Sequence, residues 1–467
     1  MRSRQFLLDA LLDSAALFKL THHFAHEEGT CLLYSGGPYE TAQCSYLFLF
    51  PYDCIKIQAG VRQRCRVNKP LELSNEANPW KAMQNLASEM GKGESSFPEW
   101  VGFFGYEMGA FSDHDVVIPH QLASTPEAYW QRCAVTLMLE HASGKATVQF
   151  IEDEACFVNE AVKEWVALLS TQEGWQQLLK IDISKEKENS PLSLGSISET
   201  QEKYLSKIEI AKEFIKSGDV YQINLSQQWE FLGCPDPFDL FKRLALLNPA
   251  PFSAYFHTKE FSIVSSSPER FLQKKAGLLE TRPIKGTAPR GRTPADDETN
   301  KRSLLASEKE QAELTMITDL MRNDLGKISV NGSVEVPLLC GCEAYHNVFH
   351  LYSIVRSRVL SHLHPLEIIR ACFPGGSITG CPKLRAMEII AELEQRPRGI
   401  YTGAIGYLAE NGDFDLNIAI RTVLLSEKKV NVQLGGGIVI DSNPIKEYEE
   451  IFHKGRSIFE ILNADSV

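Results

Sequence analysis

The sequence lacks the features that mark membrane and nucleic-acid-binding proteins. No apolar run reaches the roughly 18 residues that a membrane-spanning helix needs, so we expect no membrane partner. Basic residues are not in excess: the formal net charge is −12, which argues against nucleic acid because phosphate binding needs a basic face. An acidic chain can still hold a small anion where a few Arg and Lys side chains gather.

Metal-type cysteine spacing and a secretory signal are also missing. None of the 11 cysteines belongs to a CxxC pair, which excludes the usual zinc spacing, and we expect most of them to be reduced and buried. Asp9 and Asp13 interrupt the apolar stretch near the N-terminus, so we interpret this stretch as helical and expect a cytoplasmic protein. Internal repeats and low-complexity tracts are absent as well.

The 467 residues form an ordinary globular composition, with 43% hydrophobic and 23% charged residues. Short strand-like runs mix with helical segments in no simple βαβ repeat, which predicts an α+β fold with large mixed or antiparallel sheets flanked by helices. A charged and then Ser/Pro-rich stretch over 182–200 is the best candidate for a linker. We therefore expect an N-terminal region over 1–185 and a catalytic region over 200–467, interlocked in one body.

Several elements can be assigned from their patterns. Two β-like runs, 135–140 and 146–151, flank a His-Ala-Ser-Gly turn and predict a hairpin. Strands are also expected at 31–37, 46–51 and 220–226, and helices at 204–216 and 384–393.

Two acidic clusters each place two carboxylates three residues apart, Glu310 with Glu313 and Glu447 with Glu450. Both lie in helical stretches, where residues at i and i+3 share a face. Converging carboxylates repel one another unless a hard cation lies between them, and Mg²⁺ commonly binds one or two carboxylates together with a charged substrate. Taken singly, each cluster is more typical of a solvated helix face.

A glycine-rich loop, residues 374–383, precedes the predicted helix at 384–393 and includes Thr379 and Gly380. Backbone N–H groups at a helix start can bind an anion, and Pro382 suits a first helical turn. Cys381-Pro382 stands where a Walker A loop needs Gly-Lys, so ATP binding is disfavoured. The alternative is a plain turn that starts a helix.

Three glycines, Gly435, Gly436 and Gly437, interrupt a β-like run. Glycine inside a strand marks either a bulge or a close approach by a ligand or another backbone. Arg421 follows the predicted strand 416–420. Lys454 stands one helical turn after Glu450, which predicts either a surface salt bridge or a cation that grips a carboxylate beside a metal.

Lys285 stands between a β-branched residue and a glycine, with Arg282 nearby in the sequence. A lone lysine is usually a solvated charge, but one beside other cations and away from water loses its proton and becomes a nucleophile. Glu269 is a candidate general acid or a partner of Arg270. His350 is, on its own, more typical of a core histidine than of a catalytic one.

In order, these segments resemble the chorismate-utilising enzymes, most densely over residues 200–460. The matching strings are Gly218-Asp219-Val220-Tyr221-Gln222-Ile223-Asn224, Ser267-Pro268-Glu269, Pro283-Ile284-Lys285-Gly286-Thr287, Asp319-Leu320-Met321-Arg322-Asn323-Asp324, the Thr379 loop, Tyr401-Thr402-Gly403-Ala404, the Gly435 run and Glu447–Lys454. So many matches in order make an accidental similarity implausible.

The resemblance implies a role for each candidate residue. His350 matches a histidine close to the reacting ring, and Glu269 matches the general acid that helps the ring hydroxyl to leave. The carboxylates that match Mg²⁺ ligands are Glu310, Glu313, Glu447 and Glu450. The positions that match binders of the two chorismate carboxylates are Thr379, Gly380, Tyr401, Arg421, Gly435, Gly436, Gly437 and Lys454.

Two positions separate the subfamilies. Isochorismate-forming members carry a lysine base around position 222, where this chain has Gln222. Anthranilate synthase component I usually has alanine at position 285, whereas aminodeoxychorismate synthase component I has a lysine that attacks the ring. Lys285 therefore favours an Mg²⁺-dependent transferase that makes 4-amino-4-deoxychorismate for p-aminobenzoate and folate. Anthranilate synthase component I, of the tryptophan pathway, is the alternative.

The resemblance also implies a partner and an effector pocket. The sequence has no Cys nucleophile with a downstream His of the glutaminase type, so a separate glutamine amidotransferase subunit is expected to supply ammonia. The segments with Ser35, Pro251, Phe252 and Ser253 resemble a pocket where relatives bind tryptophan, and a purely structural filling role is the alternative. A non-catalytic amino-acid-binding subunit is disfavoured, because the acidic and basic site residues are all present.

Overall fold

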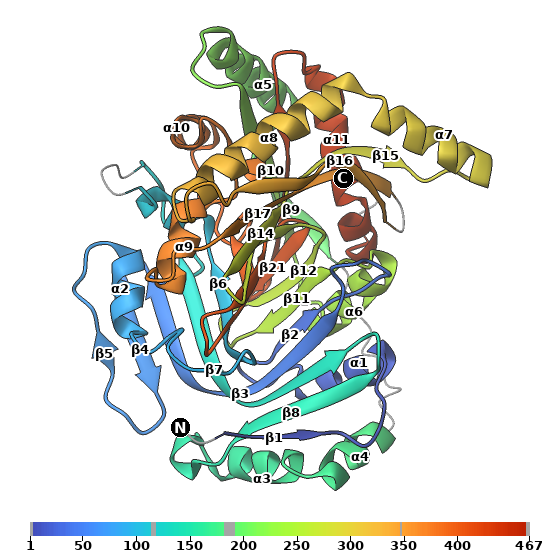
Figure 1. The fold of residues 1–467 in the computed structure, drawn as a ribbon. Helices are drawn as coiled ribbons and strands as arrows, with labels where there is room; N and C mark the ends of the chain where they lie inside the picture. The colour runs from blue at the N-terminus through green and yellow to red at the C-terminus, as the bar shows by residue number, and fades with distance from the viewer. Residues whose placement is uncertain (1–2, 114–117, 182–191, 346–347, 464–467) are drawn as a thin grey trace.

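The structure, a computed structural model, describes residues 3–113, 118–181, 192–345 and 348–463. Antiparallel sheets and flanking helices build it, as the α+β prediction requires (Figure 1). Every strand pair within the described ranges is antiparallel. No helix in these ranges is long and apolar enough to cross a bilayer.

The first sheet runs from an edge strand in the middle of the sequence, β9, to the N-terminal strand β1. Each strand pairs with the next in this spatial order: β9 (Ser193–Ile197), β10 (Gln222–Leu232), β22 (Lys429–Ile438), β21 (Thr422–Ser426), β12 (Ser262–Ser267), β11 (Phe252–His257), β2 (Cys31–Tyr34), β3 (Cys44–Gln58), β7 (Ala128–Glu140), β8 (Lys145–Ile151) and β1 (Ser3–Leu7). The short β18 (Gly380–Cys381) also pairs with β10.

The second sheet branches from the same long strand β7. Its C-terminal half pairs with β8, while its N-terminal half pairs with β6, so β7 belongs to both sheets. The second sheet continues through β6 (Pro98–Phe104), β19 (Ala404–Ala409), β20 (Phe414–Asn417), β13 (Arg270–Lys275), β14 (Leu278–Arg282), β17 (Val348–Arg358) and β16 (Glu335–Ala344), and β15 (Ile284–Pro289) also lies on β17. β4 (Val61–Arg66) and β5 (Glu72–Leu73) extend outward from β3.

Both sequence regions contribute neighbouring strands to these sheets. β2 of the N-terminal region pairs with β11, and β6 pairs with β19. The helices around them are α1 (Ser14–Phe24), α2 (Pro79–Leu86), α3 (Glu160–Leu169), α4 (Gln172–Lys180), α5 (Gln201–Lys216), α6 (Pro237–Leu247), α7 (Pro294–Leu305), α8 (Glu308–Gly326), α9 (Pro365–Cys372), α10 (Lys383–Glu394) and α11 (Pro444–Ile461).

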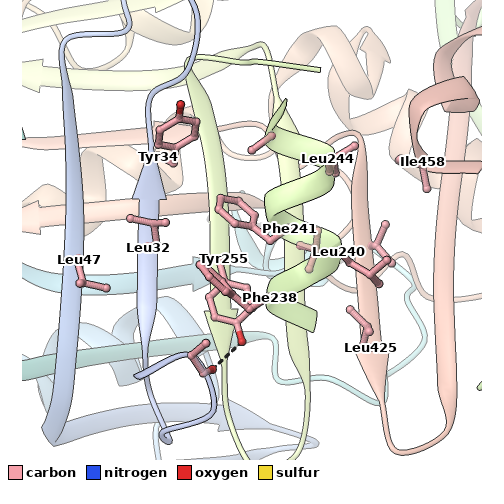
Figure 2. Close-up of a cluster of buried hydrophobic side chains, with 14 of the residues drawn as sticks. Leu32, Tyr34, Leu47, Phe238, Leu240, Phe241, Leu244, Tyr255, Leu425 and Ile458 are labelled. Atoms are coloured by element: carbon pink, nitrogen blue, oxygen red, sulfur yellow. Dashed lines mark hydrogen bonds between the residues drawn. The ribbon is translucent and has the colours of Figure 1, made fainter. Parts of the chain in front are cut away.

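The largest core lies where helices cover the first sheet. Figure 2 shows Phe238, Phe241 and Leu244 of α6 directed at side chains of neighbouring strands, Tyr255 of β11 among them. The Tyr255 hydroxyl donates a 2.7 Å hydrogen bond to the carbonyl oxygen of Ala25, so this buried ring keeps its polar group satisfied (Figure 2). Each fully buried side chain of this kind contributes about 1.5–3 kcal/mol to folding.

The two helices that carry the acidic clusters each start at a side chain that caps the first turn. The Ser307 side chain accepts from Glu310 N at the start of α8, and Asn443 accepts from Lys446 N at the start of α11. Figure 1 shows both helices beside the edge formed by β15 and β16. This placement brings their acidic first turns close to Lys285 on β15.

Four local predictions were wrong. Residues 3–7 form strand β1, which pairs with β8, and not a helix. Residues 193–197 of the expected linker form β9, and 182–191 lie outside the described residues. Arg421 does not end a strand over 416–420: β20 ends at Asn417, and Arg421 directly precedes β21. Pro382 is the N-cap residue of α10, one position before its first turn.

Candidate active site

Lys285 projects from β15 to the place where the two sheets approach each other. Its Nζ donates a 3.1 Å hydrogen bond to the carbonyl oxygen of Ser377. A Cβ built on Gly437 would lie 3.2 Å from this Nζ and 2.8 Å from the side-chain nitrogen of Gln222. The amine is therefore enclosed by the 374–383 loop, β22 and β10, and position 437 leaves room only for glycine.

Gln222 carries an unusual feature for a fully buried side chain. Neither its Oε1 nor its Nε2 has a hydrogen-bond partner among the described residues. Buried amides are nearly always paired, so an unpaired one beside a reactive amine indicates a place for a polar ligand. Gln222 stands where the resemblance puts the lysine base of isochorismate-forming enzymes.

The surroundings of Lys285 favour its neutral form. Burial lowers the pKa of Lys285 most, and the nearby charge of Lys454 lowers it further. The second cation is Lys454, whereas Arg282, the neighbour in sequence, is paired instead with Glu280 at 2.6 Å and Glu40 at 3.2 Å. Sequence proximity thus named the wrong cation, because Arg282 ends β14, where it pairs with Glu280, and Lys285 lies on the separate strand β15.

Glu269 lies between β12 and β13 on the same site. The Ser377 hydroxyl donates a 2.6 Å hydrogen bond to its Oε1, so Ser377 contacts both Glu269 and, through its carbonyl, Lys285. Burial raises the pKa of Glu269 to about 7, against hydrogen bonding from Ser377 and the charge of Lys285. Arg270 does not pair with Glu269: it binds Glu280 and Asp415. A protonated carboxyl near neutral pH is what a general acid requires.

His350 lies in the part of β17 that pairs with β15, opposite Thr287. Its Nδ1 lies 3.0 Å from the Thr287 hydroxyl, and its Nε2 lies 3.5 Å from Nη2 of Arg421. Burial lowers the pKa of His350 to about 3, with the charge of Arg421 acting in the same direction. Arg421 itself has φ of 50°, a left-handed backbone that an arginine adopts only under constraint. The low pKa favours a neutral ring beside the Arg421 guanidinium.

The 374–383 loop is held by a buried ion pair. Arg398 and Glu394 lie 2.8 Å apart with side chains 1% exposed, and Arg398 also donates to the Ile378 carbonyl oxygen at 3.1 Å. The Thr379 hydroxyl donates to Gly375 O at 2.9 Å. A Cβ on Gly380 would lie 2.2 Å from Gln222 O, and the Tyr401 ring lies under the Arg398 guanidinium at 5.8 Å. The pair thus positions Thr379, Gly380 and Tyr401 together.

The glycine run on β22 faces this site. A Cβ on Gly435 would lie 2.2 Å from Leu225 O, and a Cβ on Gly436 would lie 3.4 Å from Lys454 Nζ. Lys454 Nζ donates to Gly435 O at 3.2 Å and forms an ion pair with Glu450 at 2.7 Å. The strand therefore keeps its regular pairing with β10, and the close approaches are to a backbone and to site side chains.

The four carboxylates affect one another electrostatically. Burial raises the pKa values of Glu310, Glu313 and Glu447, and neighbouring acidic groups of the same set add to each rise. The pKa of Glu450 is lowered instead, chiefly by Lys454. Glu310 Oε2 would lie 2.9 Å from a Cβ on Gly286, the residue after Lys285. The two helices thus carry excess negative charge to the edge of the lysine site.

The four carboxylates do not form a single preformed set of metal ligands in the described residues. In the described part of the chain, no group of three or more His, Cys, Asp or Glu side chains is close enough to hold a metal ion. The donor chemistry nevertheless fits Mg²⁺ in smaller sets, because Mg²⁺ takes one or two carboxylates and fills its other positions with water and substrate oxygens. Glu310 with Glu313, and Glu447 with Glu450, are the pairs that would hold it.

Apart from the lysine site, a cavity of about 270 Å³ lies between the two sheets. All four residues predicted for a tryptophan pocket line it: Ser35, Pro251, Phe252 and Ser253. We call it the inter-sheet cavity. Its buried charges are paired, with Arg270 bound to Asp415 at 2.9 Å and Lys274 lying 3.5 Å from Asp413, while Lys275 at its rim is exposed.

Sequence reasoning missed two contributors to the lysine site. The carbonyl oxygen and hydroxyl of Ser377 join Lys285 to Glu269, and Tyr345 packs on His350 with ring centroids 5.1 Å apart. The serine lay within the glycine-rich loop but carried no charge to attract notice. Tyr345 gave no sequence signal, because its contacts come from distant segments.

Comparison with known proteins agrees with this geometry. The family model described as chorismate binding enzyme matches residues 31–460. The chain is 37% identical over 366 residues to aminodeoxychorismate synthase component 1 of Bacillus subtilis, covering 77% of this chain and 76% of that protein. It is 40% identical over 353 residues to the chloroplastic aminodeoxychorismate synthase of Arabidopsis thaliana, covering 74% of this chain but only 36% of that protein.

A solved structure shows the same architecture. Anthranilate synthase component I from Streptococcus pneumoniae TIGR4 superposes with a TM-score of 0.76 at 28% identity, covering 98% of this chain and 100% of that one. The two β-sheets, the lysine site at their junction and the family match over nearly the whole length lead to one conclusion: the chain belongs to the chorismate binding enzyme family.

Proposed function

We propose that this chain is component I of an aminodeoxychorismate synthase, which converts chorismate and ammonia to 4-amino-4-deoxychorismate, a precursor of p-aminobenzoate and folate. The observation that carries the proposal is the amine of Lys285, which lies beside Ser377 and Gly437 in surroundings that lower its pKa. Similar proteins include both aminodeoxychorismate synthases and an anthranilate synthase, and Lys285 favours the first.

Cationic groups and the glycine run receive the substrate. Chorismate is a dianion, and Arg421, Lys454 and the backbone around Thr379 offer positive charge and N–H groups to its carboxylates. Mg²⁺, when bound by the carboxylates of α8 and α11, would supply further positive charge to one carboxylate of the substrate. The glycines at 435–437 keep side chains out of the space beside Lys285.

Covalent catalysis by Lys285 splits the substitution into two steps. The neutral amine forms a C–N bond to the ring carbon remote from the hydroxyl and loses a proton, the ring double bonds shift, and the C–O bond breaks. Glu269, protonated, gives its proton to the departing hydroxyl, which leaves as water. Ammonia then bonds to the carbon that bore the hydroxyl, and the Lys285 nitrogen leaves with its electron pair and regains a proton.

Ammonia needs a source, which we propose is a separate glutamine amidotransferase subunit. The name "component 1" of the Bacillus relative supports a second component. None of the 11 cysteines, all of which lie in the described part of the chain, forms a disulfide, which suits a reducing compartment, and we propose that the reaction takes place in the cytoplasm.

Product analysis tests the proposal. The full chain is supplied with chorismate, MgCl₂ and ammonium salt, which replaces the partner subunit. We expect a product that a lyase converts to p-aminobenzoate. Fluorescent anthranilate with release of pyruvate would instead establish the anthranilate synthase alternative, and absence of any chorismate turnover would overturn both.

A further inference from the structure

Two aromatic rings from distant parts of the sequence close one side of the lysine site. Tyr39 lies between β2 and β3, and Tyr345 directly follows β16. Their rings stack with centroids 4.4 Å apart and planes at 28°, and both side chains are buried. The Tyr39 hydroxyl donates to Pro249 O at 3.2 Å, which anchors this N-terminal residue against the segment before β11.

Tyr345 contacts two parts of the site at once. Its ring meets the His350 ring edge-on, with centroids 5.1 Å apart at 75°. Its hydroxyl donates a 3.3 Å hydrogen bond to the carbonyl oxygen of Pro268, the residue directly before Glu269. One side chain thus touches the imidazole and the turn that carries the proposed general acid.

The same two tyrosines lie near the Arg421 guanidinium. Burial lowers the pKa of Arg421. The nearby Tyr345 and Tyr39 offset part of this shift. The groups that face His350 are the Arg421 and Lys454 cations, the Thr287 hydroxyl and the Gly286 carbonyl oxygen, with Tyr345 against the ring. The Glu343 carboxyl lies near the Tyr345 hydroxyl. Two cations therefore disfavour a charged imidazole, and the aromatic wall keeps water from stabilising one.

We propose that Tyr345, backed by Tyr39, is a positioning residue of the chorismate site: its ring fixes His350 and Arg421 in the arrangement that receives the substrate, and its hydroxyl fixes the turn that carries Glu269. The inference rests on the proposed function for its catalytic consequence. Its effect on His350 is a property of the free protein.

The proposal separates the ring from the hydroxyl. Tyr345→Phe keeps the stack on Tyr39 and the contact with His350, and it loses what the hydroxyl contacts, the Pro268 carbonyl oxygen and the Glu343 carboxyl. Tyr345→Leu and Tyr39→Ala each break the stack, and the leucine still fills much of the space. Phe6→Ala is the control, since it removes a ring from another aromatic pair, Phe6 with Phe150, at the far edge of the first sheet.

The first measurement is a histidine NMR titration of the free, ¹⁵N-histidine-labelled chain, with His350→Gln to assign the signal. In the unaltered chain and in Tyr345→Phe, we expect His350 to stay neutral down to the acid limit of folding. In Tyr345→Leu and Tyr39→Ala, water reaches the ring, so the pKa of His350 moves upward toward its ordinary 6.5. An unchanged His350 titration in both stack-breaking variants would overturn the inference.

The second measurement is kcat/KM for chorismate against pH. For Tyr345→Leu we expect a loss of up to about fourfold near pH 6 that shrinks as the pH rises, because an imidazole whose pKa approaches 6.5 is about three-quarters protonated at pH 6 and loses that proton at higher pH. Tyr345→Phe should lose less than Tyr345→Leu at every pH. A loss equal at all pH values, or one matched by Phe6→Ala, would mean that the tyrosine serves only as packing. If the unaltered chain turns over no chorismate, the proposed function fails, and the titration still decides the inference.

Discussion

The lysine site and the inter-sheet cavity differ in how their polar groups are satisfied. In the inter-sheet cavity the buried charges are paired, with Arg270 between Glu280 at 2.8 Å and Asp415 at 2.9 Å. Beside Lys285, the side-chain oxygen and nitrogen of Gln222 both lack hydrogen-bond partners among the described residues. Three of the four nearby carboxylates have raised pKa values.

This difference separates a site built for charged reactants from one closed by its own side chains. Unpaired buried groups cost folding free energy and persist where a ligand satisfies them. Among the described residues, the lining of the inter-sheet cavity has no comparable unpaired buried group, and the binding of tryptophan there stays a prediction. Variants that remove unpaired groups should therefore cost activity, and variants that break paired ones should cost stability.

The largest effect is expected at Glu269. Glu269→Gln keeps the size of the side chain but cannot give a proton, so kcat should fall by about 10²–10⁴-fold. In the unaltered chain, kcat/KM should have a bell-shaped pH dependence, because the reaction needs Lys285, whose pKa is lowered, without its proton and Glu269, whose pKa is raised to about 7, with its proton. A pH profile of Glu269→Gln should lack the alkaline fall. A full-rate variant with an unchanged profile would exclude Glu269 as the acid.

A paired group gives the next effect, on stability. Arg398→Met leaves Glu394 buried without its partner, and the free energy of unfolding should drop by about 3–5 kcal/mol. Urea unfolding followed by circular dichroism measures it. The double variant Arg398→Met/Glu394→Leu removes the stranded charge and should recover part of the loss. If the free energy of unfolding dropped less than in a variant that breaks an exposed pair, such as Lys163 with Glu154, the result would contradict the pairing.

Gly437 tests how closely the strand approaches the amine. Gly437→Ala places a Cβ 3.2 Å from Lys285 Nζ and 2.8 Å from Gln222 Nε2, so one of these side chains must move. We expect kcat to fall by about 10–100-fold, because a displacement near 1 Å at a reacting group has this scale of cost. Steady-state kinetics beside a melting curve separates this effect from misfolding. Unchanged kinetics would show that the space beside the amine is not used.

The smallest expected effect is on the free energy of unfolding, and it should have opposite signs for a variant near Lys285 and a variant in the inter-sheet cavity. Glu310→Gln removes a repelled carboxylate, so at pH 7 it should raise the free energy of unfolding by less than about 1 kcal/mol, since solvent screens the charge. A raised folded pKa means that the ionised form opposes folding, so the gain should vanish at acid pH, where the carboxyl is protonated in both states. Asp415→Asn, which weakens a pair with Arg270, should instead destabilise. If both variants changed the free energy of unfolding in the same direction, the distinction between the lysine site and the inter-sheet cavity would be lost.

Local patterns predicted the elements better than their contacts. The helices with the acidic clusters and the glycine run within β22 follow from periodicity and composition. β1 was missed because its strand conformation comes from pairing with β8, 140 or so residues later in the chain, which no local pattern reports. Lys454 as the neighbour of Lys285, and Tyr345 as the neighbour of His350, depend likewise on how the sheets meet.

The central claim is that Lys285 forms a transient bond to the substrate ring. Its most direct test is peptide mass spectrometry of the chain, acid-quenched during turnover of chorismate. The account predicts that the peptide containing Lys285 gains the mass of chorismate minus one water, and that Lys285→Ala gives neither adduct nor aminodeoxychorismate. Product formation by Lys285→Ala at the unaltered rate, with no adduct on Lys285 in the unaltered chain, would contradict it.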